Sequence, residues 1–310
     1  MTEYMTTKEL ADFLRIKQRK VYDLATSGRI PCSRAMGKLL FPRAEIEAWV
    51  AQGMGEGAAP RAATGSTAGS VAAQPRPGVF LGSHDPLLDW ALRQSRCGLA
   101  TFFDGSLDGL DRFAAYEGVA TGLHLFDGDV AEDDMEPDRR WNIGTVEDRF
   151  RTSPSVLVEF AWRERGLIVA PDRVDRFATI ADLRGRLIVP RQAEAGSQEL
   201  LQHLLAAEGF GDTDYVLTDP ARTETDAAQV IADGMGEVAL GLRASAEQFK
   251  LAFVPVMRER FDILVDRKAW FEPPMQDFIA FCRTPAFQAK ADTMGGYDIS
   301  GLGSVHFNGA

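Results

Sequence analysis

The stretch IADLRGRLIVPRQAEAGSQELLQHLL, residues 180–205, decides the fold class of most of the chain. The apolar run at 186–189 has the length of a buried strand, a polar loop follows it, and apolar residues then recur with helical spacing from Ser197 onward. Strand, short loop and helix repeat in this order along residues 78–310. This alternation predicts an α/β architecture with mainly parallel sheets.

Apolar runs and helical periodicity place the individual elements of this region. The predicted strands are 79–81, 99–102, 156–162, 166–170, 186–189, 215–217, 238–240, 251–256 and 261–265. The predicted helices are 86–95, 106–116, 197–207, 225–233, 243–248, 274–282 and 285–292.

Three of the predicted strand-to-helix loops carry polar residues: Gly82–Asp85, Phe103–Ser106 and Arg191–Ser197. In an open α/β sheet, ligands bind at the carboxyl ends of the strands, where helix N-termini present unpaired N–H groups. Together the loops predict a site for an anion or a polar small molecule, although such turns also favour Gly and Ser for purely structural reasons. Asp85 is interpreted as a helix N-cap rather than a ligand contact.

The first fifty residues have a different pattern. Thr6 and Glu9 have the spacing of a capping box. Leu10, Phe13 and Leu14 then fall on one face of a helix. A second, basic helix is expected after a short break, and a Ser-Gly pair ends it.

A positive helix that follows a tight turn is the pattern that places side chains in the DNA major groove. Residues 30–41 read as a small hairpin, or wing, and Pro42 can start a last helix whose inner side includes Ile46 and Trp49. A solvated charged helix face is the alternative interpretation. We predict DNA binding by six residues: Lys17, Gln18, Arg19 and Lys20 on the second helix, and Arg34 and Lys38 on the wing.

Charge is divided unevenly along the chain. Residues 1–53 carry nine Lys or Arg and six Asp or Glu, whereas the whole chain has a net charge of -11. Twenty of the 27 residues from 51 to 77 are Ala, Gly, Ser, Thr or Pro, a composition typical of a flexible linker. A basic head on an acidic body fits one nucleic-acid-binding module joined to a module that avoids DNA.

The head also resembles a known family. The string YMTTKELADFLRIKQRKVYDLATSGRIP, residues 4–31, followed by GKLLFPRAEIEAWV, residues 37–50, is similar to the small winged helix-turn-helix of the excisionase/MerR-like family. The shared features are a Val-Tyr pair in the second helix, the SGRIP turn at 27–31 and the closing Glu-Ala-Trp at 47–49. This resemblance implies a DNA-binding head.

The body resembles the cytoplasmic periplasmic-binding-protein-like domain that is also found fused to molybdopterin-biosynthesis proteins and molybdate-type regulators. VFLGSHDPLLDWAL (79–92) and FAWRERGLIVAP (160–171) carry the resemblance, together with residues 180–205. The implied fold class is a small all-α winged helix-turn-helix head plus an α/β two-lobed type II periplasmic-binding-protein-like domain. The implied divisions are a head at 1–53, a linker at 54–77, and a body at 78–310 with lobe I at 78–162 and 251–310 and lobe II at 163–250.

The same resemblance implies a ligand in the cleft between the lobes. The implied ligand-binding residues are Ser83, His84, Ser106 and His124 from one lobe, Arg191, Gly196 and Ser197 from the other, and Arg163 at the crossing. We expect the ligand to be a small oxyanion such as molybdate or tungstate, or a molybdenum-cofactor-related compound. An organic metabolite is the alternative, and Trp162, Tyr297 or Phe103 would then form an aromatic wall.

Several function classes are disfavoured, and a cofactor-biosynthesis protein is kept only as a less favoured alternative to a regulator. The sequence has no catalytic motif such as HExxH or GxSxG, so we predict no enzyme, no catalytic residue and no cofactor. The three cysteines, Cys32, Cys97 and Cys282, suggest neither a metal site nor a disulfide framework. Without a signal peptide or a long apolar run, we expect a cytoplasmic protein with no membrane partner. We expect a homo-oligomer on double-stranded DNA, because one small head contacts few base pairs.

The Arg19→Ala variant tests the head. Because Arg19 is predicted to read bases or phosphates, we expect weaker operator binding in a gel-shift assay and unchanged ligand binding in calorimetry. Equal operator affinity of the variant and the wild type would remove Arg19 from the DNA-binding set.

Overall fold

The chain divides into two compact units, residues 1–72 and 73–310. The structure is a computed structural model, and it describes residues 4–14, 21, 33–35, 38–43, 46, 75–127 and 141–310. Each unit is described by itself below.

The first unit contains a three-stranded antiparallel sheet with the order β1-β3-β2 and one described helix. Its elements are β1 (Tyr4–Thr6), α1 (Thr7–Leu14), β2 (Ser33–Ala35) and β3 (Lys38–Pro42). The predicted hairpin is confirmed, since Ala35 pairs with Lys38 at the turn between β2 and β3. The strand β1, which pairs with β3, was not predicted from the sequence.

The predicted capping box at the start of α1 is confirmed. The Thr6 backbone N–H donates to Glu9 Oε2 at 2.8 Å, and the Glu9 N–H donates back to Thr6 Oγ1 at 3.3 Å. Leu10, Val21 and Ile46 are buried, as the apolar spacing predicted. Phe13 lies in the predicted helix but is 42% exposed, and the Arg43 guanidinium lies over its ring. Residues 17–20 and Trp49 lie outside the described residues.

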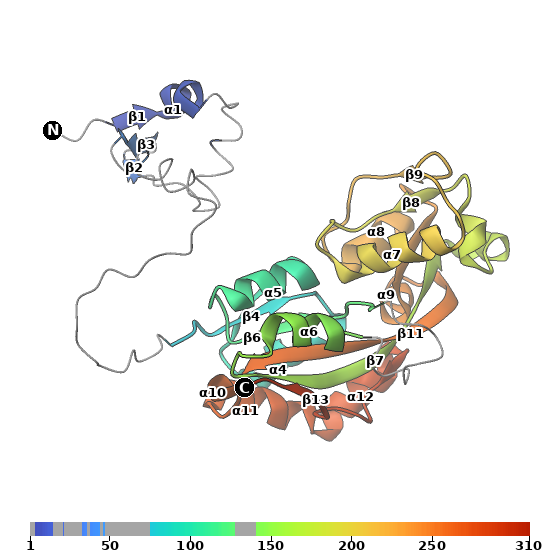
Figure 1. Ribbon diagram of the computed structural model, residues 1–310. Coiled ribbons are helices and arrows are strands. Elements are labelled where there is room, and N and C mark those ends of the chain that lie inside the picture. Colours follow the sequence, from blue (N-terminus) through green and yellow to red (C-terminus); the bar gives the residue numbers. More distant parts are fainter. Residues whose placement is uncertain are drawn as a thin grey trace. The chain divides into compact units, whose positions relative to one another are not determined.

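One ten-stranded sheet runs through the whole second unit (Figure 1). The strand order is β5-β4-β6-β11-β7-β10-β8-β9, and β12 and β13 pair with β7 outside this path. The strands are β4 (Val79–Gly82), β5 (Ala100–Phe103), β6 (Ala120–Leu123), β7 (Ser155–Val169), β8 (Leu187–Val189), β9 (Val216–Leu217), β10 (Val238–Leu242), β11 (Ala252–Asp266), β12 (Tyr297–Asp298) and β13 (Val305–Asn308).

The helices follow the predicted alternation closely. They are α4 (Pro86–Ser95), α5 (Ser106–Ala114), α6 (Ile143–Phe150), α7 (Gly196–Ala207), α8 (Glu224–Ala232), α9 (Arg243–Gln248), α10 (Arg267–Trp270), α11 (Pro273–Cys282) and α12 (Pro285–Met294), with 3-10 turns at Pro171–Arg176 and Ile180–Leu183. The strand β6 and the helix α6 are the main elements that the sequence analysis missed.

The second unit has two lobes, as Figure 1 shows. In the first lobe, α4, α11 and α12 pack on one face of the sheet around Phe160 and Phe278. On the other face, α5 and α6 pack around Phe113 and Val146. In the second lobe, α7 and α8 cover opposite faces of the sheet, which includes β8 and β10.

The two lobes are joined by β7 and β11, which we call the crossing strands. They pair antiparallel from Ser155 opposite Asp266 to Val169 opposite Ala252. The sequence analysis predicted each as two separate strands, and that prediction is wrong because the charged residues between the apolar runs continue the strands. Register shifts at Pro255/Met257 and at Phe261/Asp262 are β-bulges, which bend a strand locally.

The structure differs from the predicted architecture in the direction of some strands and in the position where the chain returns to the first lobe. The prediction of mainly parallel sheets holds for β4, β5 and β6 and for β8, β9 and β10, but the crossing strands pair antiparallel with each other, with β6 and with β10. Residues 251–257 pack in the cores of the second lobe, so the chain returns to the first lobe after residue 257 rather than at 251.

Arg76 holds the start of the second unit. Its side chain donates to the carbonyl oxygens of Phe113 at 2.6 Å and Gly118 at 3.1 Å, and it pairs with Asp266 at 3.1 Å. The guanidinium also lies 4.2 Å from the ring centres of Phe113 and Tyr116. The last residues of the segment predicted as a linker therefore belong to this unit.

Among the described residues, no helix combines the length and the apolar character needed to cross a bilayer. Cys97 and Cys282 are buried with free thiols, and burial raises the pKa of the Cys282 thiol. Cys32 lies outside the described residues.

The Arg76→Ala variant tests this attachment. Because the variant removes one donor from Asp266 and from each of two carbonyl oxygens, we expect the free energy of unfolding to fall by about 2 kcal/mol in urea titrations. Arg93→Ala is the control, since Arg93 is exposed and pairs with Asp89 within one helix, where such pairs contribute about 0.5 kcal/mol or less. Equal effects of the two variants would contradict the role of Arg76.

Candidate ligand-binding site

The two lobes contact each other through the loops at the carboxyl ends of their strands. The loop after β5 meets the loop after β8, where the Leu107 N–H donates to the Glu194 carbonyl at 3.2 Å and the Gln192 side chain donates to the Asp104 carbonyl at 3.0 Å. Arg222 also pairs with Asp104 across this contact. The predicted site residues lie around this junction, which we call the interlobe site.

Two glycines let the loops approach this closely. Gly105 has a φ of 129°, and a Cβ there would lie 2.4 Å from the Glu194 carbonyl oxygen. A Cβ on Gly196 would lie 2.6 Å from the His124 carbonyl oxygen. Any other residue at either position would push the lobes apart.

Helix caps position the polar residues at the interlobe site. Asp85 is the N-cap of α4 and accepts a hydrogen bond from the Leu88 N–H at 2.7 Å, which confirms the prediction for this residue. Thr223 and Asp226 form a capping box at the start of α8 and so fix Glu224, its first residue. Gly196 and Ser197 begin α7, whose N-terminus faces the first lobe beside His124.

Three hydroxyl groups gather at the interlobe site. Ser83 Oγ and Ser106 Oγ lie 2.6 Å apart, and Ser106 Oγ also accepts the His124 N–H at 3.2 Å. Ser197 is 2% exposed, and its hydroxyl has no hydrogen-bond partner among the described residues. Because buried hydroxyl groups are normally satisfied, this one marks a place where a ligand atom could bind.

A buried network of three arginines and three carboxylates forms the floor of the site. Arg163 pairs with Asp85 at 2.8 Å and with Glu259. Arg165 pairs with Glu259 at 2.7 Å and Glu224 at 3.0 Å. All of these side chains are almost fully buried.

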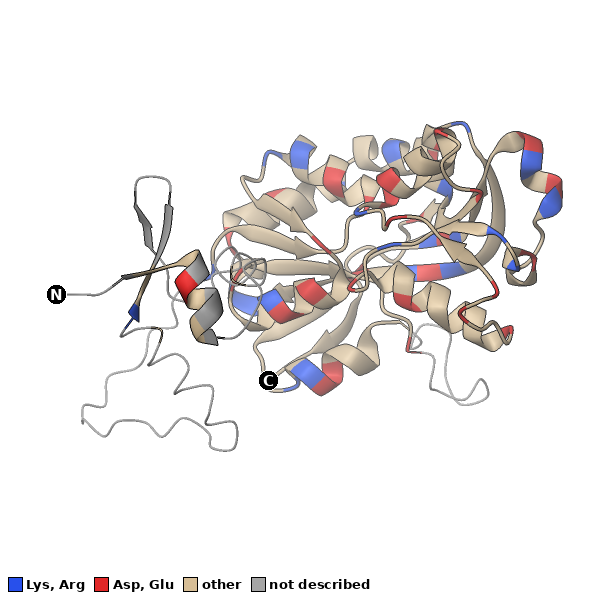
Figure 2. Ribbon diagram, turned by 90° about the horizontal axis from the view of Figure 1, so that it is seen from above, with Lys and Arg blue, Asp and Glu red and all other residues tan. Residues whose placement is uncertain are grey.

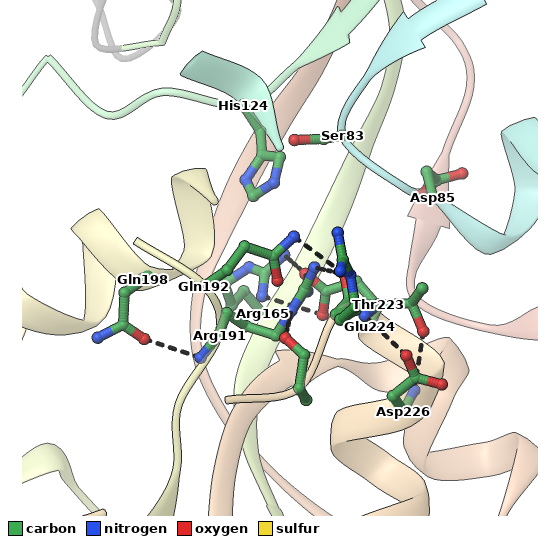
Figure 3. Close-up of polar contacts among 12 residues, drawn as sticks. Ser83, Asp85, His124, Arg165, Arg191, Gln192, Gln198, Thr223, Glu224 and Asp226 are labelled. Atoms are coloured by element: carbon green, nitrogen blue, oxygen red, sulfur yellow. Dashed lines mark hydrogen bonds and ion pairs between the residues drawn. The ribbon is translucent and has the colours of Figure 1, made fainter. Parts of the chain in front are cut away.

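Arg191 from the second lobe completes the network. It pairs with Glu224 at 3.0 Å, and Figure 3 shows Arg165, Arg191 and Glu224 meeting below His124 and Ser83. Its guanidinium also donates to the carbonyl oxygens of Ala221 at 3.0 Å and Arg222 at 2.8 Å. We call the six charged side chains the interlobe ion network.

The network keeps Glu224 and Glu259 ionised. Burial by itself would raise the pKa of Glu224, but the neighbouring Arg165 and Arg191 guanidiniums overcome it and lower that pKa to about 2. Burial opposes ionisation of Glu259 in the same way, yet Arg163 and Arg165 hold its pKa well below the usual value. Three guanidiniums therefore face three carboxylates, and the floor of the site is close to neutral.

His124 and Tyr297 border this network. Burial lowers the pKa of His124 and favours its neutral form, although its Nδ1 lies 3.2 Å from Glu259 without a well-aligned hydrogen bond. Burial also raises the pKa of Tyr297, so its hydroxyl stays protonated and donates to Asp85 at 2.8 Å.

The structure brings most of the predicted ligand residues together. Ser83, Ser106, His124 and Gly196 touch one another across the lobe junction, and Arg163 and Arg191 belong to the same ion network. The His84 ring packs edge-on to Phe103, and its buried Nδ1 has no partner among the described residues. Whether these residues and Ser197 contact a ligand stays a prediction.

The sequence analysis missed Arg165, Glu224 and Glu259. A signal for Arg165 was present in FAWRERGLIV, where Arg163 and Arg165 flank Glu164 between two apolar runs. Such alternation places both arginines on one side of the strand, and a buried arginine requires a buried partner.

The predicted DNA-binding residues are described in part. Arg34 lies on β2 opposite Leu39, and Lys38 begins β3 opposite Ala35. Lys17, Gln18, Arg19 and Lys20 lie outside the described residues, so their role stays a prediction. In the part of the chain that the structure describes, no group of three or more His, Cys, Asp or Glu residues is arranged to hold a metal ion.

Residues 90–283 match the family model of the PBP superfamily domain, which is more than half of the chain. The chain belongs to the PBP superfamily. Residues 4–54 separately match the model of a helix-turn-helix domain. The helix-turn-helix domain implies DNA binding, and the PBP superfamily domain implies binding of a small molecule. Both parts of the predicted fold class are thereby confirmed.

Several known proteins are similar to this chain. The uncharacterized protein YvgK of Bacillus subtilis (strain 168) is 23% identical over 319 residues, which cover 98% of each chain. A putative phosphate ABC transporter substrate-binding protein from Clostridium perfringens has a TM-score of 0.48 at 10% identity and covers 70% of this chain and 96% of its own. The regulatory domain of MetR, a LysR family regulator from N. meningitidis, has a TM-score of 0.45 at 12% identity, with 74% and 97% covered.

The pH dependence of stability tests the interlobe ion network. The pKa of Glu224 is lowered on folding, so its pairing stabilises the folded state above the ordinary pKa of 4.5 and is lost as the pH falls towards 2. We expect the free energy of unfolding of Glu224→Gln to be about 3 kcal/mol lower than that of the wild type at pH 7. In urea titrations this difference should shrink steadily below pH 5, because a protonated Glu224 resembles glutamine.

Glu208→Gln is the matched control, since Glu208 is exposed at the end of α7. It should differ little from the wild type at any pH. A deficit of Glu224→Gln that stays constant from neutral to acidic pH would show that ionic pairing is not its cause.

Proposed function

We propose that this protein is a cytoplasmic, ligand-responsive transcription regulator rather than an enzyme. The observation that carries the proposal is the presence of a helix-turn-helix domain and a PBP superfamily domain in one chain. The first supplies contacts to duplex DNA, and the second supplies two lobes that can close on a small molecule. Neither function needs a chemical step.

DNA binding is proposed for the head through Lys17, Gln18, Arg19 and Lys20, with Arg34 and Lys38 on the hairpin. We propose that the regulator acts as a homo-oligomer, because two heads on paired half-sites bind far more tightly than one. Acidic and basic residues are interspersed over the described helices of the second unit (Figure 2).

A small oxyanion such as molybdate or tungstate, or a compound related to the molybdenum cofactor, is the first proposed ligand. The support is the set of donors at the interlobe site: the hydroxyls of Ser83, Ser106 and Ser197 and the N-termini of α5 and α7. Helix N-termini and hydroxyl groups bind oxyanions without needing a net positive charge. Arg191 lies at the edge of this donor set.

An organic metabolite is the second proposed ligand. It is favoured by the interlobe ion network, since a simple anion would face Glu224 and Glu259 as well as the arginines. A molecule that carries both an acidic and a basic group could pair with both kinds of side chain. Phe103, which packs against His84, would supply an apolar wall.

Ligand binding can alter DNA affinity by favouring one arrangement of the lobes over another. The crossing strands carry this change, because they are the elements that run through both lobes. The bulges near Pro255 and Phe261 are the places where they can bend.

Calorimetry with molybdate, tungstate, sulfate and a panel of small amino and carboxylic acids tests the ligand, and a gel shift with and without the binding compound tests regulation. The Ser197→Ala variant sharpens this test. Because Ser197 Oγ has no partner among the described residues, its removal should leave stability unchanged and weaken ligand binding about tenfold.

Ser155→Ala is the matched control, because Ser155 is also buried with an unpartnered hydroxyl but lies at the start of β7. It should bind ligand like the wild type. Equal affinities of all three proteins would remove Ser197 from the site, and an absence of duplex binding at low salt would refute the regulator.

A further inference from the structure

A second pocket lies on the opposite side of the crossing strands from the interlobe ion network. Successive residues of a strand point to opposite faces. Arg163 and its register partner Glu259 belong to the network, whereas the neighbouring Trp162 points the other way with its register partner Arg260. The pocket has a volume of about 630 Å³, and Trp162, Met257 and Arg258 contribute to its lining. We call it the hinge pocket.

Aromatic and thioether side chains form one wall of the hinge pocket. Phe126 and Trp141 lie with their ring centres 5.1 Å apart, and both line the pocket together with Trp162 and Met257. Such a wall binds the hydrocarbon or aromatic part of a small molecule. The volume falls in the range of pockets that hold organic ligands, about 300 to 1,000 Å³.

A carboxylate lies on the other side of the pocket. Glu159 is only 7% exposed, and one of its oxygens bonds to His306 at 2.9 Å. Gly301 lies against the other oxygen, since a Cβ there would be 1.9 Å from Glu159 Oε1. The absence of a side chain at position 301 lets the chain pack this closely, and both Glu159 and Gly301 are part of the lining.

A second carboxylate stands at the rim. Asp298 pairs with Arg258 at 2.8 Å, and Arg258 is 57% exposed. Among the described residues that line the pocket, the one guanidinium is thus already paired, and the imidazole is bonded to Glu159. Carboxylates beside indole rings attract cations, because the face of an aromatic ring is negative.

We propose that the hinge pocket is a second small-molecule site, which takes an organic cation with an apolar body. Its ammonium group contacts Glu159, and its hydrocarbon part lies against Trp162 and Trp141. Because both crossing strands line the pocket, its occupant favours the hinge geometry in which the pocket has this shape. The site is separate from the interlobe site and does not depend on DNA binding.

Titration of the full chain with phenethylammonium, followed by calorimetry and tryptophan fluorescence, tests the proposal. Phenethyl alcohol has the same apolar body without the charge and is the matched ligand control. We expect the ammonium compound to bind about tenfold more tightly than the alcohol, since it gains a charge-assisted hydrogen bond. Equal affinities of the two compounds, or no binding of either, would overturn the proposal.

Two variants locate the binding. Glu159→Gln should weaken phenethylammonium binding about tenfold, whereas Glu208→Gln on the surface should leave it unchanged. Arg258→Ala, at an exposed position, should strengthen binding a few-fold because it frees Asp298. If Glu159→Gln does not fold, Arg258→Ala decides: weaker or unchanged phenethylammonium binding in that variant would show that the ammonium group does not lie beside these carboxylates and would refute the inference. None of these readouts involves DNA, so they can fail while the regulator proposal stands.

Discussion

The pairing of three buried arginines with three buried carboxylates constrains the rest of the second unit. Leaving one such charge without its partner costs about 3 to 5 kcal/mol, so Arg163, Arg165 and Arg191 must meet Asp85, Glu224 and Glu259 in the folded chain. These groups come from both crossing strands and from loops of both lobes. The network therefore fixes the register of the crossing strands and the approach of the lobes at the same time. Any change in the angle between the lobes has to exchange some of these partners for water or for a ligand.

Much of the fold could be predicted from the sequence. The helices α4 and α9 have the predicted bounds, α7 begins one residue earlier than predicted, and α8 both begins and ends one residue earlier. The strand β6 was missed because Ala120–Leu123 is short and contains one β-branched residue, and its neighbours β4 and β11 rather than its own propensity keep it extended. The sequence analysis predicted a break in each crossing strand at its arginines. Apolar periodicity is a local signal, so it cannot show that a glutamate far away in the sequence pairs with those arginines.

The candidate site was predictable to a lesser extent. Ser83, Ser106 and Arg191 could be predicted because each lies in a loop that follows a strand. Polar residues at the carboxyl ends of the strands of a parallel sheet lie at the same edge, where ligands bind. Glu224 and Glu259 gave no comparable signal, since each becomes part of the site through contacts that span tens of residues. Those two carboxylates change the electrostatics of the site from cationic to nearly neutral, which is why the class of ligand could not follow from the loops. The hinge pocket depends on side chains brought together from four separate stretches of the chain, and none of these has a local motif.

The attachment at Arg76 has a mechanical consequence. Its ion-pair partner, Asp266, is the last residue of β11, so the chain enters the second unit at the end of a strand that runs through both lobes. A pulling force applied through the N-terminal segment would act on the Arg76–Asp266 ion pair. It would therefore act on the backbone of β11 rather than on a surface loop.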